Sequence, residues 1–245
     1  MESHRAALAM IASIRQVVTN KLRRRLGALN KECGIPPALA RHLACKSSIS
    51  VIDVGAHAGE FTRRLDLFRH IDRGLLIEPQ PNRAKELASK FPPPRFEVAA
   101  MAVSDHPSVI DLEINGFDPT TSILKTKRDL PQLAGIDVAI REIVRCPVAT
   151  LDSLVSSERL PQIDLLKLDV QGAERLVVRG AHETLKRTQM VWTEVSFVAL
   201  YDGACLFHEI HADLNALGFQ LAELEAGFRS LQGELVQADA LFLKH

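Results

Sequence analysis

The sequence predicts an α/β fold in which helices cover both faces of a mostly parallel sheet. An apolar run at 49–54 breaks into small residues at Gly55 and Gly59, which indicates a buried strand that ends in a tight turn. Apolar residues at helical spacing follow in 60–70, and strand and helix patterns alternate again after them. A chain that alternates in this way builds a parallel sheet with right-handed crossovers.

The remaining elements continue the alternation and end in one antiparallel pair. We expect further strands at 74–78, 95–103, 163–170, 190–196, 219–223 and 240–243, and further helices at 82–90, 173–185 and 206–217. The main sheet then has about seven strands. The connection at 224–237 has the character of a hairpin, which makes the last two strands antiparallel neighbours. Alternating residues at 109–114 can pair with 144–148 in a side hairpin or small extra sheet.

The first 46 residues are predicted to form a helical extension, and residues 47–245 the main domain. Apolar residues recur at spacings of three and four between positions 8 and 26, which indicates an amphipathic helix with a basic end at Arg23, Arg24 and Arg25. This helix could make a peripheral contact with a membrane or grip an anionic substrate. The alternative is that it packs against the domain and leaves its charges in solvent.

Composition indicates a soluble globular protein with a sizeable core. The chain has 245 residues, of which 47% are hydrophobic. Lys plus Arg equal Asp plus Glu at 30 each, so the whole molecule has no general attraction for nucleic acid or anionic lipid. Four cysteines without a C-x-x-C pair suit neither a disulfide framework nor a zinc site, and indicate the reducing cytoplasm. No apolar run approaches the roughly 18 to 20 residues of a transmembrane helix, and no signal peptide is expected.

The turn at 55–59 has the composition of a nucleotide-type binding loop. A glycine backbone turns sharply and can approach a ligand closely, and the next helix presents free N–H groups at its positive end. Asp53, Gly55 and Gly59 occupy the first, second and last fixed positions of the D/E-x-G-x-G-x-G loop of S-adenosylmethionine (SAM)-dependent methyltransferases. His57 replaces the middle glycine. Glu78, 23 residues after Gly55, lies where a nucleotide fold places the acid that binds ribose hydroxyls. A plain turn in an α/β protein is the alternative interpretation of the loop.

Six ordered stretches carry a resemblance to a known family. Within residues 49–201 they read V-I-D-V-G-A-H-A-G, L-I-E-P-Q-P-N, A-V-S-D, T-L-D-S-L, L-L-K-L-D-V-Q-G-A-E and W-T-E-V-S-F-V-A-L-Y. The chain therefore resembles the FkbM family of SAM-dependent methyltransferases. The resemblance implies a Rossmann-like, seven-stranded class I methyltransferase fold, SAM as cofactor, and O-methylation of a hydroxyl on a sugar, glycolipid or small natural product. Gln171 departs from the family pattern, in which glutamate is commoner at this position.

The resemblance also implies the residues that bind the cofactor, which lie in and just before the glycine loop and near the ends of three later strands: Asp53, Gly55, Ala56, His57, Gly59, Glu78, Ser104, Asp105 and Asp169. The loop would hold the methionine part of SAM, Glu78 its ribose, and the Ser104–Asp105 turn its adenine. Asp169 would face the transferred methyl group. A hydroxyl acceptor benefits from a base, for which Asp169 and Glu194 are the main candidates and His57 a third. The sequence leaves open which of them acts, and whether a divalent metal bridges them.

The sequence fits two other functions less well than methyl transfer. An NAD-dependent oxidoreductase would share the β-α-β start, but the chain lacks the G-x-G-x-x-G loop that accommodates a pyrophosphate. A non-catalytic module with a SAM-binding fold would be free to lose its acidic site residues, and all four of them are present: Asp53, Glu78, Asp105 and Asp169.

Partners follow from what the sequence contains and lacks. No metal site is predicted, because His208 and His211 are three residues apart and the metalloprotease motif needs four. Nucleic acid is disfavoured, since no D-P-P-Y motif and no basic, aromatic-rich face is present. We expect a small-molecule or glycan acceptor, selected by the N-terminal helix and by the long insertion at 116–141. That insertion is expected to be a lid or substrate loop, with disorder as the alternative.

Overall fold

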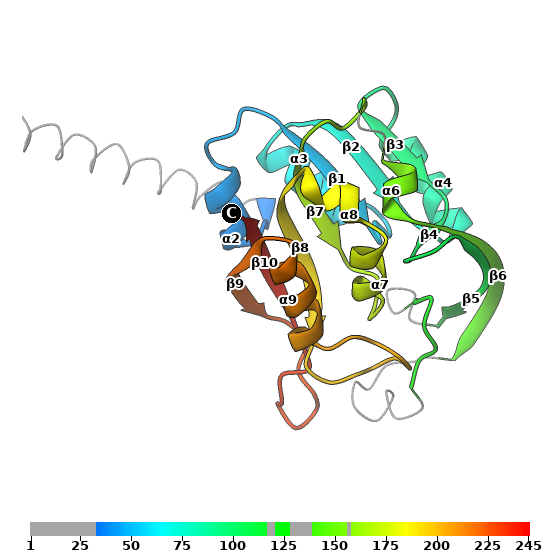
Figure 1. The fold of residues 1–245 in the computed structure, drawn as a ribbon. Coiled ribbons are helices and arrows are strands. Elements are labelled where there is room, and N and C mark those ends of the chain that lie inside the picture. The colour runs from blue at the N-terminus through cyan, green and yellow to red at the C-terminus, as the bar shows by residue number, and fades with distance from the viewer. Residues whose placement is uncertain (1–32, 117–120, 128–138, 156–157) are drawn as a thin grey trace, which may run out of the picture.

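A seven-stranded sheet forms the centre of the molecule (Figure 1). The computed structural model describes residues 33–116, 121–127, 139–155 and 158–245. The strand order is β3-β2-β1-β7-β8-β10-β9, and β10 runs antiparallel to both of its neighbours. The strands are β1 (Ile49–Val54), β2 (Ile71–Ile77), β3 (Phe96–Ala99), β7 (Ile163–Leu168), β8 (Thr188–Ser196), β9 (Phe219–Ala226) and β10 (Gln237–Lys244). The predicted seven strands and the antiparallel final pair are confirmed.

The strand order reverses at β1, which lies between β2 and β7. Val54 is opposite Ile77 of β2 and Leu168 of β7, so the three strands end at the same level. Chain segments leave this edge in opposite directions toward the two halves of the sheet. Open α/β sheets bind ligands in the crevice that such a reversal creates.

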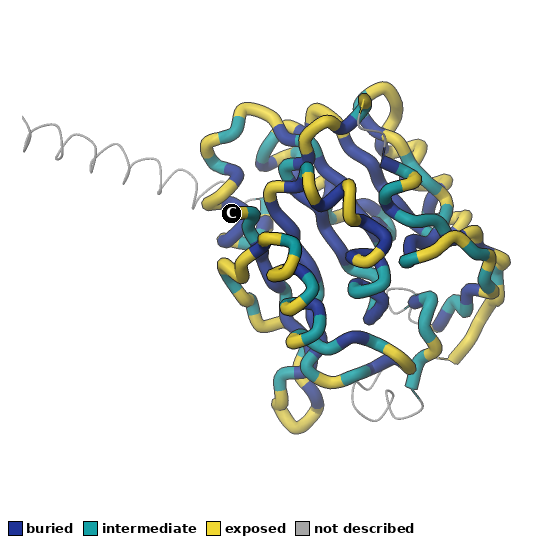
Figure 2. The backbone as a smooth tube through the Cα atoms, viewed as in Figure 1, coloured by how far each residue is buried: buried dark blue, intermediate teal, exposed yellow. Residues whose placement is uncertain are grey.

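Helices cover both faces of the sheet, as expected (Figure 1). Buried side chains form one core with α2, α3 and α4 and another with α6 to α9. The buried central strands between these two layers are the dark band in Figure 2. The helices are α2 (Pro37–Leu43), α3 (Glu60–Phe68), α4 (Pro81–Lys90), α6 (Leu151–Leu154), α7 (Glu174–Arg179), α8 (His182–Lys186) and α9 (Phe207–Ala216).

The single helix predicted over 173–185 is wrong, because α7 and α8 are separate helices. The chain turns at Gly180, which packs directly on the backbone of Ser104. A Cβ atom at Gly180 would lie 2.2 Å from the Ser104 carbonyl oxygen. The contact therefore fixes the turn after β4 against the helical layer.

The strand predicted over 95–103 is also divided. β3 stays in the main sheet, whereas β4 (Ala102–Val103) joins β5 (Ser108–Asn115) and β6 (Ile140–Ala149) in a second sheet of order β4-β6-β5. Ile110 lies opposite Cys146 in the antiparallel β5–β6 pair, which confirms the predicted small extra sheet. The chain thus leaves the main sheet immediately beside the crevice.

The described part of the N-terminal extension belongs to the main core. Leu39 and Leu43 of α2 are fully buried against α3 and the sheet. The amphipathic helix expected between positions 8 and 26 lies outside the described residues, and the division of the chain at residue 46 stays a prediction. No helix in the described ranges is long and apolar enough to cross a membrane.

Candidate active site

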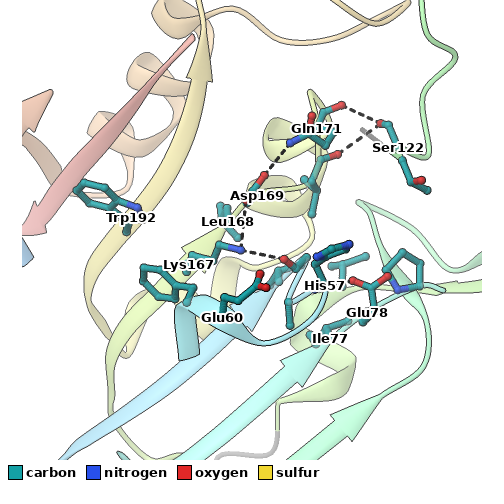
Figure 3. A pocket seen from close by; sticks show the side chains of 18 of the residues that line it. His57, Glu60, Ile77, Glu78, Ser122, Lys167, Leu168, Asp169, Gln171 and Trp192 are labelled. Carbon is teal, nitrogen blue, oxygen red and sulfur yellow. Dashed lines mark hydrogen bonds and ion pairs between the residues drawn. The ribbon is translucent and has the colours of Figure 1, made fainter. Parts of the chain in front are cut away.

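A cavity of about 590 Å³ opens over the carboxyl ends of β1, β2, β7 and β8, where the strand order reverses. Its volume is within the roughly 300–1,000 Å³ typical of small-molecule sites. The wall comes from the glycine loop, α3, the turns after β2 and β3, the loop after β7, and segments 34–36 and 121–123. Figure 3 shows side chains from these elements converging on the space above the strand ends.

The glycine loop (residues 55–59) packs so closely on neighbouring parts of the chain that its glycines have no room for a side chain. Gly55 has φ +77°, and a Cβ there would lie 1.9 Å from the Asp169 carbonyl oxygen. Gly59 has φ +79° and packs on Phe91 and Leu87, where a Cβ would approach within 2.4 and 2.8 Å. Gly55 therefore shapes the cavity, whereas Gly59 allows α3 to begin close to α4.

Glu78 is held at the cavity wall by two backbone groups. The His57 N–H donates to Oε2 at 2.8 Å, and the Gln80 N–H donates to Oε1 at 3.0 Å. Glu78 is 3% exposed, yet it lines the cavity. These two hydrogen bonds fix the Glu78 carboxylate at the cavity wall, where it can meet a ligand hydroxyl.

Lys167 links Asp53 and Asp169 beneath the loop. Its ammonium lies 3.1 Å from Asp53 Oδ1 and 3.4 Å from Asp169 Oδ2, and it donates to the Gly55 carbonyl at 2.8 Å. Burial alone lowers the pKa of the Lys167 ammonium, but the two carboxylates outweigh burial and raise it. Lys167 is therefore a fixed positive charge. Thr62 donates to Asp53 Oδ2 at 2.6 Å, so Asp53 anchors the loop from below and does not line the cavity.

Gln171 joins the two predicted catalytic acids. Its amide nitrogen donates to Asp169 Oδ1 at 2.9 Å and lies 3.4 Å from Glu194 Oε2, and Tyr201 donates to its oxygen at 3.0 Å. Gln237 also donates to Glu194 Oε2, at 2.6 Å. Figure 3 shows Asp169 between Lys167 and Gln171. Asp169 lines the cavity, whereas Glu194 lies behind Gln171.

Several carboxyl groups lie close together near the carboxyl ends of β7 and β8. Burial raises the pKa of Glu194 well above its ordinary value, and the nearby carboxylates of Asp169, Glu174 and Asp239 raise it further. Glu174 receives N–H groups from Val170 and Gly172 at the start of α7. An amide at Gln171 supplies a neutral hydrogen-bond donor where a glutamate would add one more negative charge.

The structure separates the sequence-predicted cofactor residues into two groups. Gly55, Ala56, His57, Glu78 and Asp169 line the cavity together. The others lie behind its wall: Asp53, Gly59, Ser104 and Asp105. In that second group the Ser104 hydroxyl lies 3.2 Å from Asp105, which also pairs with His106.

Sequence reasoning missed several cavity residues. Lys167 and Asp239 could have been predicted, because each is a charged residue inside an otherwise apolar strand. Trp192 carries no such signal, because a buried aromatic suits any core strand. In the described part of the predicted insertion, Ser122 lines the cavity and donates to the Gln171 carbonyl at 2.8 Å. Most of the insertion lies outside the described residues, so its role as a lid stays a prediction. Within the described ranges no group of three or more His, Cys, Asp or Glu is placed to hold a metal ion.

Comparison with known proteins agrees with this geometry. The model of the methyltransferase FkbM domain matches residues 53–221. The 2-O-methyltransferase NoeI of Sinorhizobium fredii (strain NBRC 101917 / NGR234) is 31% identical over 161 residues, which are 62% of this chain and 65% of NoeI. The crystal structure of methyltransferase FkbM from Methylobacillus flagellatus KT superposes with a TM-score of 0.51 at 14% identity. That match covers 79% of this chain and 44% of the other. The chain thus spans less than two thirds of each of these relatives, and the structural match supports the shared fold.

Proposed function

Since the chain belongs to the FkbM family of methyltransferases, we propose that it transfers a methyl group from SAM to a hydroxyl of a sugar, glycolipid or small natural product. The observation that carries the proposal is the Glu78 carboxylate, which two N–H groups hold at the cavity wall beside the glycine loop. The name of the relative NoeI, a 2-O-methyltransferase, supports a hydroxyl acceptor.

The residues around the cavity suit SAM. Glu78 lines the cavity with its carboxylate held in place, and a carboxylate is the kind of acceptor that suits two adjacent ribose hydroxyls. Met101 and Val103 offer an apolar wall next to it for the faces of adenine, with Ser104 and Asp105 behind them. Gly55 leaves backbone close to the ligand, where a methionine part can bind through its polar groups.

Asp169 is the group that we assign to the reacting end. When bound, SAM supplies a methyl group on a positively charged sulfur. Asp169 is held by Lys167 and Gln171, so its negative charge stays fixed at the cavity edge without reorganisation. Glu194 supports this arrangement through Gln171. In-line methyl transfer mainly requires that the acceptor oxygen be held close to the methyl carbon, which is a task of positioning.

The acceptor class and the location of the protein are part of the proposal. The cavity wall carries four acidic side chains against one lysine and one arginine, and such a lining disfavours a polyanion such as nucleic acid. Cys33, Cys45, Cys146 and Cys205 are free thiols, which suits a reducing cytoplasm.

Transfer of a labelled methyl group tests the proposal. Purified protein is incubated with methyl-labelled SAM and a panel of mono- and disaccharides, phenols and aliphatic alcohols, and products are separated by mass spectrometry. The proposal expects at least one sugar or other hydroxyl compound of the panel to gain one methyl group on oxygen, and in a sugar product acid hydrolysis and linkage analysis locate that group. Labelling confined to amine or protein acceptors would contradict it.

A further inference from the structure

Asp239 and Glu60 are the two carboxylates of the cavity wall that have no partner in the described part of the chain, and of the two only Asp239 is shielded from solvent. Glu78 is held by two backbone N–H groups, and Asp169 by Lys167 and Gln171. Within the described ranges, no hydrogen bond or ion pair reaches the Asp239 side chain, although it is only partly exposed and lines the cavity. Glu60 is also unpaired there but is exposed, so water can satisfy it. A part-buried carboxylate without a partner is expected to serve a ligand.

The position of Asp239 in the sheet explains why its charge is costly. On the antiparallel strand β10 it lies directly opposite Glu194 of β8 and Glu225 of β9, so the three carboxyl groups share one face. Burial raises the pKa of Asp239 to about 6, the carboxylates of Asp169 and Glu225 raise it, and Lys167 opposes them. A carboxyl group of this kind changes its charge just below neutral pH, where a general base is most useful.

Asp239 lies at the end of the cavity remote from Glu78. Four strand spacings of about 4.8 Å separate β2 from β10, a distance of about 19 Å across the sheet. The methionine arm of SAM has six or seven bonds beyond the ribose, and an extended chain gains about 1.2 Å per bond, or about 8 Å in all. A cofactor whose ribose binds Glu78 therefore reaches β1 and β7 and leaves β10 to another molecule. Trp192 of β8 lines the same end and gives it an apolar floor.

We infer that Asp239 contacts the acceptor hydroxyl and takes its proton during methyl transfer. This inference rests on the proposed function. The acceptor oxygen forms the new C–O bond as the C–S bond breaks with both electrons going to sulfur, which becomes a neutral thioether. The acceptor proton passes to the Asp239 carboxylate and then to solvent. Asp169 is less suited to this step, because accepting a proton would break its ion pair with Lys167.

Asp239→Asn and Glu225→Gln together test the inference. Glu225 is a second carboxylate of this row, on the other side of Asp239 from Glu194, and lies outside the cavity lining. Binding of S-adenosylhomocysteine is measured by calorimetry, and methyl transfer is followed from pH 5 to 8 with the saccharide that the wild type methylates. Trp192 is the one tryptophan of the chain, so its emission reports saccharide binding beside Asp239 in the presence of S-adenosylhomocysteine.

Asp239→Asn should leave the Kd of S-adenosylhomocysteine within twofold of the wild type and lower kcat/KM for the saccharide by about 10²- to 10⁴-fold. It should also abolish the rise in rate centred near pH 6. Glu225→Gln should keep the maximal rate and move that rise to lower pH, since a like charge next to Asp239 is removed.

Three results would overturn the inference. Asp239→Asn could raise the Kd of S-adenosylhomocysteine tenfold or more, which would place Asp239 in the cofactor site. It could retain the wild-type rate with the same pH profile. Should Asp239→Asn not fold, an unmoved pH profile in Glu225→Gln would be contradictory by itself. A wild type that neither binds SAM nor methylates any hydroxyl compound of the panel would instead refute the proposed function.

Discussion

The ammonium of Lys167 lies 3.1 Å from Oδ1 of Asp53, directly beneath the glycine loop, and both side chains are almost completely closed off from solvent. Beyond this ion pair, Asp53 Oδ1 has no hydrogen bond in the described ranges. Lys167 also holds the Gly55 carbonyl and Asp169. One buried charge therefore ties the floor of the loop to the reacting end of the site.

Lys167→Met should destabilise the protein by about 3–5 kcal/mol, because it leaves the Asp53 carboxylate buried without its partner. At about 2–4 °C per kcal/mol for a chain of this size, Tm should fall by at least about 6 °C in calorimetry. Lys186→Met is the control, since Lys186 is exposed and, within the described part of the chain, pairs only with the neighbouring Glu183. An unchanged Tm in Lys167→Met would show that the pair contributes little.

Glu78→Gln should weaken SAM binding by about 1.5–3 kcal/mol, which is the usual contribution of hydrogen bonds to a charged group. The substitution keeps the side-chain shape but only one acceptor oxygen, so one of the His57 and Gln80 N–H groups loses its partner, and Tm should fall by a few degrees without unfolding the protein. Glu86→Gln on the exposed side of α4 is the matched control. Equal dissociation constants for Glu78→Gln and the wild type would remove Glu78 from the cofactor site.

Asp169→Asn should lower kcat by about 10²- to 10³-fold, as expected when a preorganised charge at the reacting centre is lost. Its side chain is 41% exposed, so loss of the contact with Lys167 should change Tm by less than about 2 °C. Steady-state kinetics and thermal melts on the same sample separate the two effects, with Asp111→Asn on the exposed face of β5 as control. A variant that melts much earlier but turns over normally would make Asp169 a structural residue.

Glu174 should make the protein less stable as pH rises. Burial raises its pKa to about 7 from an ordinary value of 4.5, although backbone N–H groups favour the charged form. Between these values the folded state keeps a proton that the unfolded chain releases, so the free energy of unfolding falls as pH increases through this window. Urea unfolding at pH 5 and pH 8 should show that Glu174→Gln removes up to about 3 kcal/mol of this fall.

The exposed Glu183→Gln provides the comparison for Glu174. Glu194 and Asp239 also have raised pKa values. The Glu174→Gln variant should therefore still lose some stability as pH rises, but less than the wild type. The same pH slope in Glu174→Gln and the wild type would contradict the assignment.

Local patterns in the sequence predict the sheet and the position of the site well. The strands that end before Gly55 and Asp169 are predictable because strand ends and tight turns have strong local signals. The break between α7 and α8 at Gly180 could not be predicted, because it depends on a contact with Ser104, which is distant in sequence. Tertiary contacts of this kind override helical periodicity.

The roles of individual acids are harder to predict than their presence. Asp53 and Glu78 both follow or end apolar runs, yet Asp53 is locked by Lys167 and Thr62 whereas Glu78 faces the cavity. Asp239 was overlooked because its strand lies near the end of the chain and meets β8 only through antiparallel pairing. The role of each acid depends on which side chains of neighbouring strands it contacts, and the spacing of residues along the sequence does not show these contacts.

Calorimetric titration of the wild-type protein with SAM and with NAD tests the central claim most directly. The account predicts that SAM binds with a Kd near the micromolar range, about −8 kcal/mol, and that NAD gives no measurable heat. The reason is that Gly55 and Glu78 form a site for a ribose and a short polar arm, without the G-x-G-x-x-G loop that a pyrophosphate needs. Tight binding of NAD together with undetectable binding of SAM at millimolar concentration would contradict it.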